Sequence, residues 1–275
     1  MKAFIKRTTV TATLTGLLLM SALPVAADDH ARVRVLHASP DAPAVDVYLN
    51  DEIVGALTNV PFGVISDYLT IPAGTHNVKV YLTGDTTSPV IDADVTVEAN
   101  GAYTVAAINP VASIQPAVLV DNPAVNSGEA LVRVVHFSPD APGVDVAPDG
   151  SEPADAVVQN LEFPDDTGYL GLPGGSYDLE VRLAGTTDVA LQLDPLSIEA
   201  GNAYSVFAIG SAAADPLGGN ALTALVTLDA QALPDSSTVR PIQAGLPVAL
   251  IASLMLGIAT FVLVVSRGRF ATNDA

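Results

Sequence analysis

The sequence predicts an all-β fold of two tandem immunoglobulin-like antiparallel β-sandwiches, followed by one C-terminal transmembrane helix. Three observations predict this fold. The pattern "RVRVLHASPDAPAVDV" returns about 100 residues later as "LVRVVHFSPDAPGVDV". Short runs alternate apolar and polar residues between Gly, Pro and Asp, which is typical of half-buried strands. A long uncharged hydrophobic run lies near the C-terminus.

The repeat continues beyond that pattern. "LTIPAGTHNVKVYLTG" corresponds to "LGLPGGSYDLEVRLAG", and "VEANGAYTVAAI" corresponds to "IEAGNAYSVFAI". A repeat of about 100 residues has the size of a domain, not of a solenoid unit. We therefore predict one sandwich over residues 31–121 and a second over residues 130–230, joined by a short polar linker at residues 122–129.

The strand pattern is clearest in the run from Thr75 to Leu82. His76, Val78 and Val80 point to one face, which we expect to be buried. The other face carries Lys79 in the first copy and Glu180 at the matched position, so we expect solvent there. Seven or eight strands in about 100 residues favour an immunoglobulin-like sandwich over the alternative, a barrel.

The N-terminal segment, residues 1–27, is typical of an export signal. Lys2, Lys6 and Arg7 form a positive start, an apolar stretch follows, and small residues end at Ala27. We expect the mature chain to begin directly after this segment, outside the cytoplasm.

Residues 244–265 form the uncharged hydrophobic run. About 20 helical residues at 1.5 Å each cover a hydrocarbon core of about 30 Å, so this run predicts a membrane span. Arg267 and Arg269 follow it, which places the tail, residues 266–275, in the cytoplasm. The Pro- and Ser-containing segment at residues 231–243 is expected to be a stalk.

Charge and cysteine content exclude several classes of function. The chain has 30 acidic and 11 basic residues, a formal net charge of −19. Such a surface repels nucleic acid and anionic lipid headgroups, so no nucleic-acid partner is expected. Without cysteine the chain has no disulfide, no thiol nucleophile and no thiolate metal site.

The repeated pattern places the same polar residues in register twice. They are His37, Ser39, Pro40, Asp41, Pro43 and Asp46 in the first copy, and His136, Ser138, Pro139, Asp140, Pro142 and Asp145 in the second. We interpret the pattern as a structural corner. The histidine ends an apolar strand row, the serine, first proline and first aspartate form a turn, and the second proline directs the chain into the next strand. A partly buried histidine then needs an aspartate or a turn carbonyl as its partner.

The alternative interpretation of this pattern is catalysis. A histidine and a serine two residues apart share a strand face, with aspartates nearby, so a Ser-His-Asp arrangement is conceivable. Against it, all the residues belong to one short loop, no strand-to-helix elbow or glycine nest offers an oxyanion hole, and the site would be duplicated. We expect no catalytic residue and no organic cofactor. A surface hydrolase is the alternative.

Calcium is the one metal that the sequence suggests. Asp140, Asp145 and Asp149 lie in an oxygen-rich stretch of the second copy, and calcium favours such loops in exported proteins. Their spacing matches no EF-hand, and a solvated acidic loop is the competing interpretation.

The segments "HASPDAPAVDVYL", "HFSPDAPGVDV", "PAGTHNVKV" and "PGGSYDLEV" resemble the bacterial and archaeal domain of unknown function DUF4397, in both copies. The resemblance implies exported, often tandem β-sandwich modules on cell surfaces. It implies no established activity, so it assigns no catalytic residues. Together with the predicted topology, it leads us to expect a membrane-anchored cell-surface protein for binding, adhesion or envelope spacing, with an extracellular glycan or protein as its partner.

Overall fold

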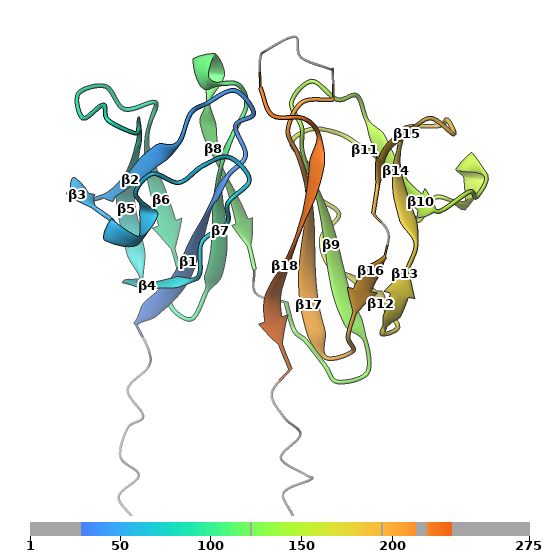
Figure 1. Cartoon of the computed structure of the whole chain (residues 1–275). Coiled ribbons are helices and arrows are strands. Elements are labelled where there is room, and N and C mark those ends of the chain that lie inside the picture. The colour runs from blue at the N-terminus through green and yellow to red at the C-terminus, as the bar shows by residue number, and fades with distance from the viewer. Residues whose placement is uncertain (1–28, 122, 194, 213–218, 233–275) are drawn as a thin grey trace, which may run out of the picture. The chain divides into compact units, whose positions relative to one another are not determined.

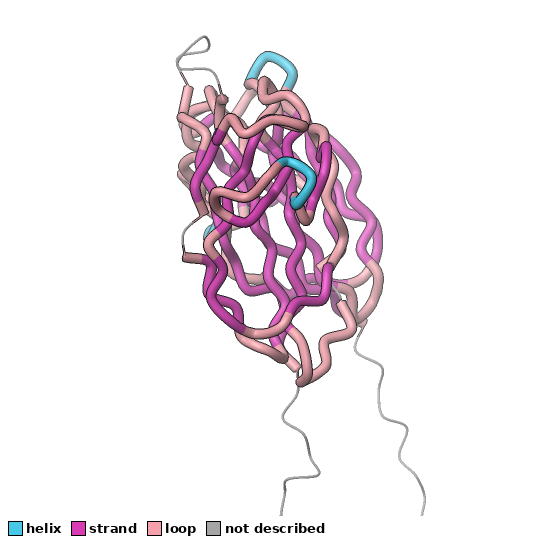
Figure 2. The backbone as a smooth tube through the Cα atoms, turned by 90° about the vertical axis from the view of Figure 1, so that its right-hand side faces the viewer, coloured by secondary structure: helices cyan, strands magenta, loops and turns pink. Residues whose placement is uncertain are grey.

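The computed structural model describes residues 29–121, 123–193, 195–212 and 219–232. Strands make up most of this part of the chain, and the helical elements described are single-turn 3-10 segments in loops (Figure 2). They are η1 (Gly55–Leu57), η2 (Val111–Ser113) and η3 (Pro153–Asp155). The all-β prediction is confirmed.

Both predicted targeting elements fall outside the described residues. The export signal, residues 1–27, the transmembrane segment, residues 244–265, and the cytoplasmic tail lie there, as does nearly all of the stalk. Within the described part, no helix has the length and apolar character needed to cross a membrane.

The first repeat contains two four-stranded sheets, drawn in blue to green in Figure 1. One has the order β4-β1-β7-β8, and the other β3-β2-β5-β6. Their bounds are β1 (His30–His37), β2 (Val45–Leu49), β3 (Glu52–Ile53), β4 (Leu69–Pro72), β5 (Gly74–Leu82), β6 (Ile91–Val97), β7 (Ala102–Ile108) and β8 (Gln115–Val120).

The core of this repeat follows from strand alternation. On β2, Val45 and Val47 are buried while Asp46 between them is half-buried, and the paired strand β5 buries Val78 and Val80. Residues of β1, β4 and β7 complete the same apolar cluster from the other sheet. The prediction that alternate residues of Thr75 to Leu82 share a buried face is confirmed at Val78 and Val80.

One pairing in each repeat corrects the antiparallel prediction. β1 lies parallel to β7, and in the second repeat β9 lies parallel to β17. Parallel neighbours need a long crossover connection. In the first repeat this connection runs through β2, β5 and β6 of the other sheet. The chain then enters β7, which lies beside β1 and runs in the same direction. Alternation within a strand carries no information on this pairing.

The second repeat has the same arrangement, except that the counterpart of the β3-β2-β5-β6 sheet is divided into two sheets (Figure 1). Its sheets have the orders β12-β9-β17-β18, β11-β10-β14-β15 and β13-β16. The bounds are β9 (Ala130–Phe137), β10 (Val144–Pro148), β11 (Val158–Leu161), β12 (Leu170–Leu172), β13 (Gly175–Tyr177), β14 (Leu179–Leu183), β15 (Val189–Gln192), β16 (Leu196–Ile198), β17 (Asn202–Ile209) and β18 (Thr223–Gln231). In both repeats the sheets are separate, so the barrel alternative is wrong. The immunoglobulin-like topology stays a prediction.

The expectation that Glu180 faces solvent is wrong. Glu180 is 3% exposed, and its carboxylate is ion-paired with the guanidinium of Arg182, which is 1% exposed. The two residues are two apart on β14 and therefore share a face. Because each charge has its partner beside it, both can be buried. The matched Lys79 is half-buried and pairs with the exposed Asp51 instead.

Candidate functional site

Each repeated motif spans a strand end, a bend and the start of the next strand. Pro40 and Pro139 lie in the bends that follow β1 and β9, and Pro43 and Pro142 lie just before β2 and β10. The prolines fix the backbone of the bend and direct it into the second strand. Each motif therefore forms a bend between two consecutive strands.

The histidine of each motif is buried and bonded across the bend. His37 is the last residue of β1 and is fully buried. Its Nε2 lies 3.0 Å from the carbonyl oxygen of Pro43, and His136 places Nε2 3.2 Å from the carbonyl oxygen of Pro142. A carbonyl only accepts, so Nε2 carries the proton and donates it in both copies. Of the two partners considered from the sequence, an aspartate or a turn carbonyl, the carbonyl is the one present.

The surroundings keep both rings neutral. Phe62 and Phe163 lie edge-on to His37 and His136, each with ring centroids 6.3 Å apart. Burial lowers the pKa of both histidines, and the bond to the proline carbonyl opposes this shift without reversing it. The neutral ring also leaves Nδ1 of His136 free to accept the backbone N–H of Ser138, at 3.3 Å.

The serines do not form a nucleophile–base pair with these histidines. Ser39 and Ser138 are fully buried. In the described part of the chain, Ser39 Oγ and His37 Nδ1 have no hydrogen-bond partner, and Ser138 Oγ lies 3.4 Å from Asp140. A serine nucleophile must contact both its base and an incoming substrate. This geometry provides neither contact.

The first aspartate of each motif binds the loop that follows the parallel neighbour strand. Asp41 Oδ1 accepts the backbone N–H of Val111 at 2.7 Å. Asp140 accepts the N–H of Ala212 at 2.9 Å and the hydroxyl of Ser211 at 2.6 Å. The aspartate thus joins the bend to the exit of β7 or β17.

The second aspartate binds a left-handed turn. Asp46 accepts the N–H of Asn59 at 2.6 Å, and Asp145 accepts those of Asn160 at 2.7 Å and Gly185 at 2.8 Å. Asn59 and Asn160 have φ of 53° and 48°, a conformation that asparagine tolerates better than most residues. Each motif therefore holds several loops together through buried or half-buried polar side chains.

The structure does not gather the predicted calcium ligands. Asp140 and Asp145 are bonded to different loops, and Asp149 is exposed in the turn after β10. No group of three or more His, Asp or Glu residues in the described segments is placed to hold a metal ion.

Buried arginines are the feature that the sequence interpretation missed. Arg133 is 2% exposed, its Nη2 lies 2.5 Å from Asp121, and its guanidinium lies 4.7 Å from the ring centroid of Tyr169. Burial opposes the charge of Arg133, but Tyr169, Asp121 and Asp229 outweigh it and raise its pKa. Arg34 has the same ring contact with Tyr68, at 4.7 Å. The sequence signal that could have predicted this contact is that an Arg and a Tyr occur at corresponding positions of both repeats.

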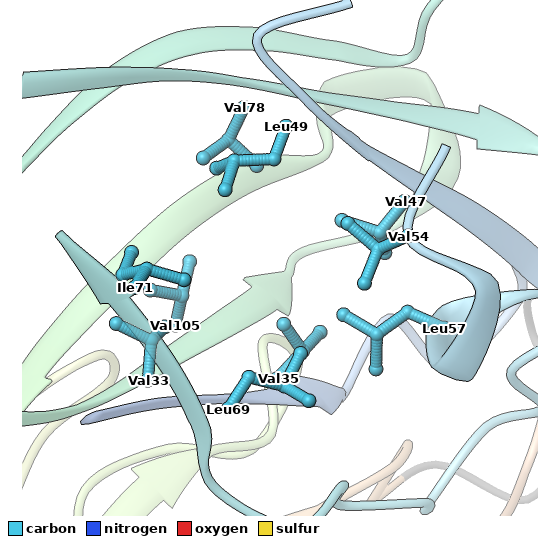
Figure 3. Close-up of a pocket in the computed structure, with 10 residues that line it drawn as sticks. All are labelled: Val33, Val35, Val47, Leu49, Val54, Leu57, Leu69, Ile71, Val78 and Val105. Carbon is cyan, nitrogen blue, oxygen red and sulfur yellow. The ribbon is translucent and has the colours of Figure 1, made fainter. Parts of the chain in front are cut away.

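An aliphatic cavity of about 50 Å³ lies between the two sheets of the first repeat (Figure 3). The side chains drawn there approach one another from both sheets, and all of them are hydrocarbon. They are Val33, Val35, Val47, Leu49, Val54, Leu57, Leu69, Ile71, Val78 and Val105. Ligand pockets are about 300–1,000 Å³ and include polar groups, so this space is a packing void and not a binding site.

A pair of tyrosines lies on the outer face of the β3-β2-β5-β6 sheet of the first repeat. Tyr48 on β2 and Tyr81 on β5 have ring centroids 5.0 Å apart and planes inclined by 65°. Both residues are half-buried, so part of each ring reaches solvent. Lys79 and Asp51 lie beside them as a hydrogen-bonded pair at 2.5 Å.

Comparison with known proteins identifies the family. The sequence model of the domain of unknown function DUF4397 matches residues 31–147 and 149–245. The chain belongs to the DUF4397 family. No curated protein matches it.

Two solved structures are similar to parts of the chain. The TIE protein of Bacillus anthracis is 11% identical, with a TM-score of 0.20, and the match covers 66% of this chain and 32% of that protein. The family 26 carbohydrate-binding module of Eubacterium rectale Amy13K, solved with maltoheptaose, is 10% identical, with a TM-score of 0.22, and the match covers 75% of this chain and 98% of the module. This chain therefore corresponds to about a third of the TIE protein. At these TM-scores neither likeness bears on function.

The two DUF4397 repeats share the motif but differ on the tyrosine face. The second repeat has Ala147, Glu180 and Arg182 where the first has Tyr48, Lys79 and Tyr81. The motif geometry is thus common to both repeats, and the half-buried tyrosine pair belongs to the first.

Proposed function

We propose that this protein is a non-catalytic binding protein of the cell exterior, in which tandem immunoglobulin-like sandwiches are tethered by residues 244–265 and bind an envelope polysaccharide. One observation carries the proposal: the histidines and serines of the repeated motif are buried inside the fold. His37, Ser39, His136 and Ser138 are all buried. What the repeats offer a partner is therefore their sheet faces and loops.

The topology part of the proposal is supported by the sequence alone. Residues 1–27 have the charge and hydropathy order of an export signal, and the uncharged run at residues 244–265 is followed by Arg267 and Arg269. This arrangement places the sandwiches outside the cytoplasm and leaves a short tail inside.

Fractionation and protease treatment of intact cells test the topology. We expect the full chain in the membrane fraction after alkaline extraction, and we expect external protease to remove the sandwiches. A variant that lacks residues 244–265 is the matched control and should be released to the medium. Full-length protein in the cytoplasm with Met1 retained would contradict the proposal.

Retention on purified cell-envelope polysaccharide tests the binding, with the full chain kept in a detergent without sugar groups. Hydrolysis of ester and glycoside substrates by the same preparation tests the alternative of a surface hydrolase. The control is the double variant Ser39→Ala and Ser138→Ala. Retention without serine-dependent hydrolysis supports the proposal. Hydrolysis that the double variant abolishes, or absence of retention, would overturn it.

A further inference from the structure

The outer face of the β3-β2-β5-β6 sheet carries the half-buried tyrosine pair of the first repeat. Strand register places Tyr48 opposite Lys79, and Tyr81 opposite Asp46, so the two rings lie diagonally across β2 and β5. Neither tyrosine hydroxyl is hydrogen-bonded to another residue in the described part of the chain. A half-buried tyrosine offers part of its ring for apolar contact and its hydroxyl for hydrogen bonding, with few rotatable bonds to immobilise.

Polar side chains continue this face along β5 and β6. Lys79 lies opposite Asp92, and Asn77 lies opposite Asp94. The Asn77 amide nitrogen donates to Asp92 at 2.9 Å and to Asp94 at 3.2 Å. The internal bonds hold these side chains in place, and their carboxylate oxygens keep further lone pairs that can accept.

The charge of the face decides which class of ligand fits it. This face and its border carry Asp46, Asp51, Asp92 and Asp94 against one lysine, and Lys79 is already neutralised by Asp51 at 2.5 Å. Together with the net charge of −19, this disfavours uronic acids, phosphate polymers and other polyanions. The carboxylates of Asp46, Asp51 and Asp92 are each held by a hydrogen bond from a neighbouring side chain, and as fixed acceptors they suit the hydroxyl donors of a sugar.

We propose that this face binds the sugar rings of an uncharged polysaccharide, with Tyr48 and Tyr81 against the C–H faces of the sugars and the carboxylates and Asn77 at their hydroxyls. The inference deepens the proposed function, on which it rests, by naming the ligand class and the binding surface. A pyranose ring has an apolar C–H face and a rim of hydroxyl groups. Aromatic rings bordered by a few fixed polar groups match both parts.

The second repeat supplies an internal contrast. At the matched positions Ala147 has no ring, and Glu180 and Arg182 are buried as an ion pair. At these positions the face therefore has no aromatic ring and no exposed side-chain donor or acceptor. Only the first repeat binds through this face, so we expect one such binding site per molecule.

Native gel electrophoresis through soluble polysaccharide tests the inference. The full chain, in a detergent without sugar groups, is run through glycogen, galactomannan and xyloglucan, and through alginate and polygalacturonate as anionic counterparts. The variants are Tyr48→Ala with Tyr81→Ala, Tyr48→Phe with Tyr81→Phe, and Tyr81→Arg, which installs the residue of the second repeat. Val189→Ala changes an exposed strand residue of the second repeat and is the matched control.

We expect at least one uncharged polysaccharide to retard the wild-type chain. The double alanine variant and Tyr81→Arg should raise the dissociation constant at least about tenfold, because they remove central aromatic contacts. The double phenylalanine variant should stay within about threefold and Val189→Ala should not change, since stacking is preserved in the former and untouched in the latter. Thermal unfolding checks that each variant is folded. If the double alanine variant does not fold, Tyr81→Arg alone tests the role of the tyrosines.

Three results would overturn the inference: no retardation by any uncharged polysaccharide, retardation by the anionic polymers alone, or equal affinity of the folded tyrosine variants and the wild type. The proposed function fails separately. If the folded double alanine variant is still retained on envelope polysaccharide as the wild type is, the protein binds glycan elsewhere and only this surface is wrong. If the wild type is not retained there, the proposed function itself is wrong.

Discussion

At the scale of single residues, the repeated motif works by matching polar side chains to backbone groups. His37 donates to the carbonyl of Pro43, and Asp41 accepts the N–H of Val111. The first bond closes the bend between β1 and β2, and the second fixes that bend against the loop after β7. Buried polar groups are tolerated when they are bonded in this way. The histidine and aspartates that could belong to a hydrolase site here connect parts of the fold.

The burial of the motif histidines predicts a loss of stability in mild acid. Their pKa values are lowered in the folded state, whereas in the unfolded chain they take up protons near pH 6.5. Below about pH 6.5 the unfolded state therefore binds more protons, and stability falls as the pH decreases through the lowered pKa values. Above that range the contribution is complete. We expect a lower melting temperature at pH 5.5 than at pH 7.5.

The variant with His37→Gln and His136→Gln is the control for this pH effect. Glutamine keeps an N–H donor for the proline carbonyl but does not titrate. We expect a lower melting temperature overall and a smaller difference between the two pH values. An unchanged pH dependence in the double variant would show that other groups cause it.

Asp145 gives a second prediction at this scale. Asp145 is 4% exposed and accepts two backbone N–H groups, from Asn160 and Gly185. Asp145→Ala leaves both donors without their acceptor, and we expect the free energy of unfolding to fall by about 2–3 kcal/mol. The matched change Asp46→Ala, at a half-buried residue, should have a smaller effect. Urea unfolding measures both, and a larger loss for Asp46→Ala would contradict this account.

At the scale of strands and sheets, the inner faces are set by alternation and the outer faces by individual partners. Val78 and Val80 are buried as their period predicts. Lys79 is half-buried beside Asp51, while Glu180 at the same position is buried beside Arg182. The outer face of this sheet therefore differs between repeats that share one core pattern, and that difference is what leaves the tyrosine pair available in the first.

The cavity of the first repeat predicts a stabilising substitution. Its volume is about 50 Å³, and cavity space costs about 24 cal/mol per Å³, so filling it adds at most about 1 kcal/mol. Val105→Ile places one more methylene group there from β7, and we expect a gain of up to about 1 kcal/mol. The matched Val206→Ile, at a residue 2% exposed in the second core, should lose about 1 kcal/mol by overpacking. Denaturant unfolding that gives the two variants the same sign would contradict the prediction.

At the scale of the whole molecule, charge is the dominant property. With 30 acidic and 11 basic residues, the formal net charge of −19 disfavours compact states through self-repulsion. Salt shortens the range of this repulsion to about 10 Å at 0.1 M and about 3 Å at 1 M. The same charge excludes polyanionic partners and is consistent with an uncharged ligand.

We therefore expect the melting temperature to rise between 0.05 M and 1 M sodium chloride. Choline chloride at the same ionic strength should act similarly, because screening does not depend on the identity of the cation. Differential scanning fluorimetry measures both series. A melting temperature that is constant or falls with salt would show that repulsion between the acidic residues does not limit stability.

The sequence by itself determined the all-β class, the presence of two copies and the inner faces of the strands. These properties depend on period-two alternation and on turn chemistry, which act between residues a few positions apart. A histidine that ends an apolar row must be buried and must find a partner, and the bend that follows it has a carbonyl within reach.

Only the tertiary structure decided which segments meet. It made β1 and β7 parallel, buried Glu180 against Arg182, kept Asp140 and Asp145 in separate loops, and brought Tyr48 beside Tyr81. Each of these outcomes depends on which strand lies next to which, and on what packs against the outer face. The parallel strand pairing and the tyrosine contact join residues far apart in the chain, and the burial of the neighbouring Glu180 and Arg182 depends on what covers their sheet, so the packing of whole sheets fixes all of them.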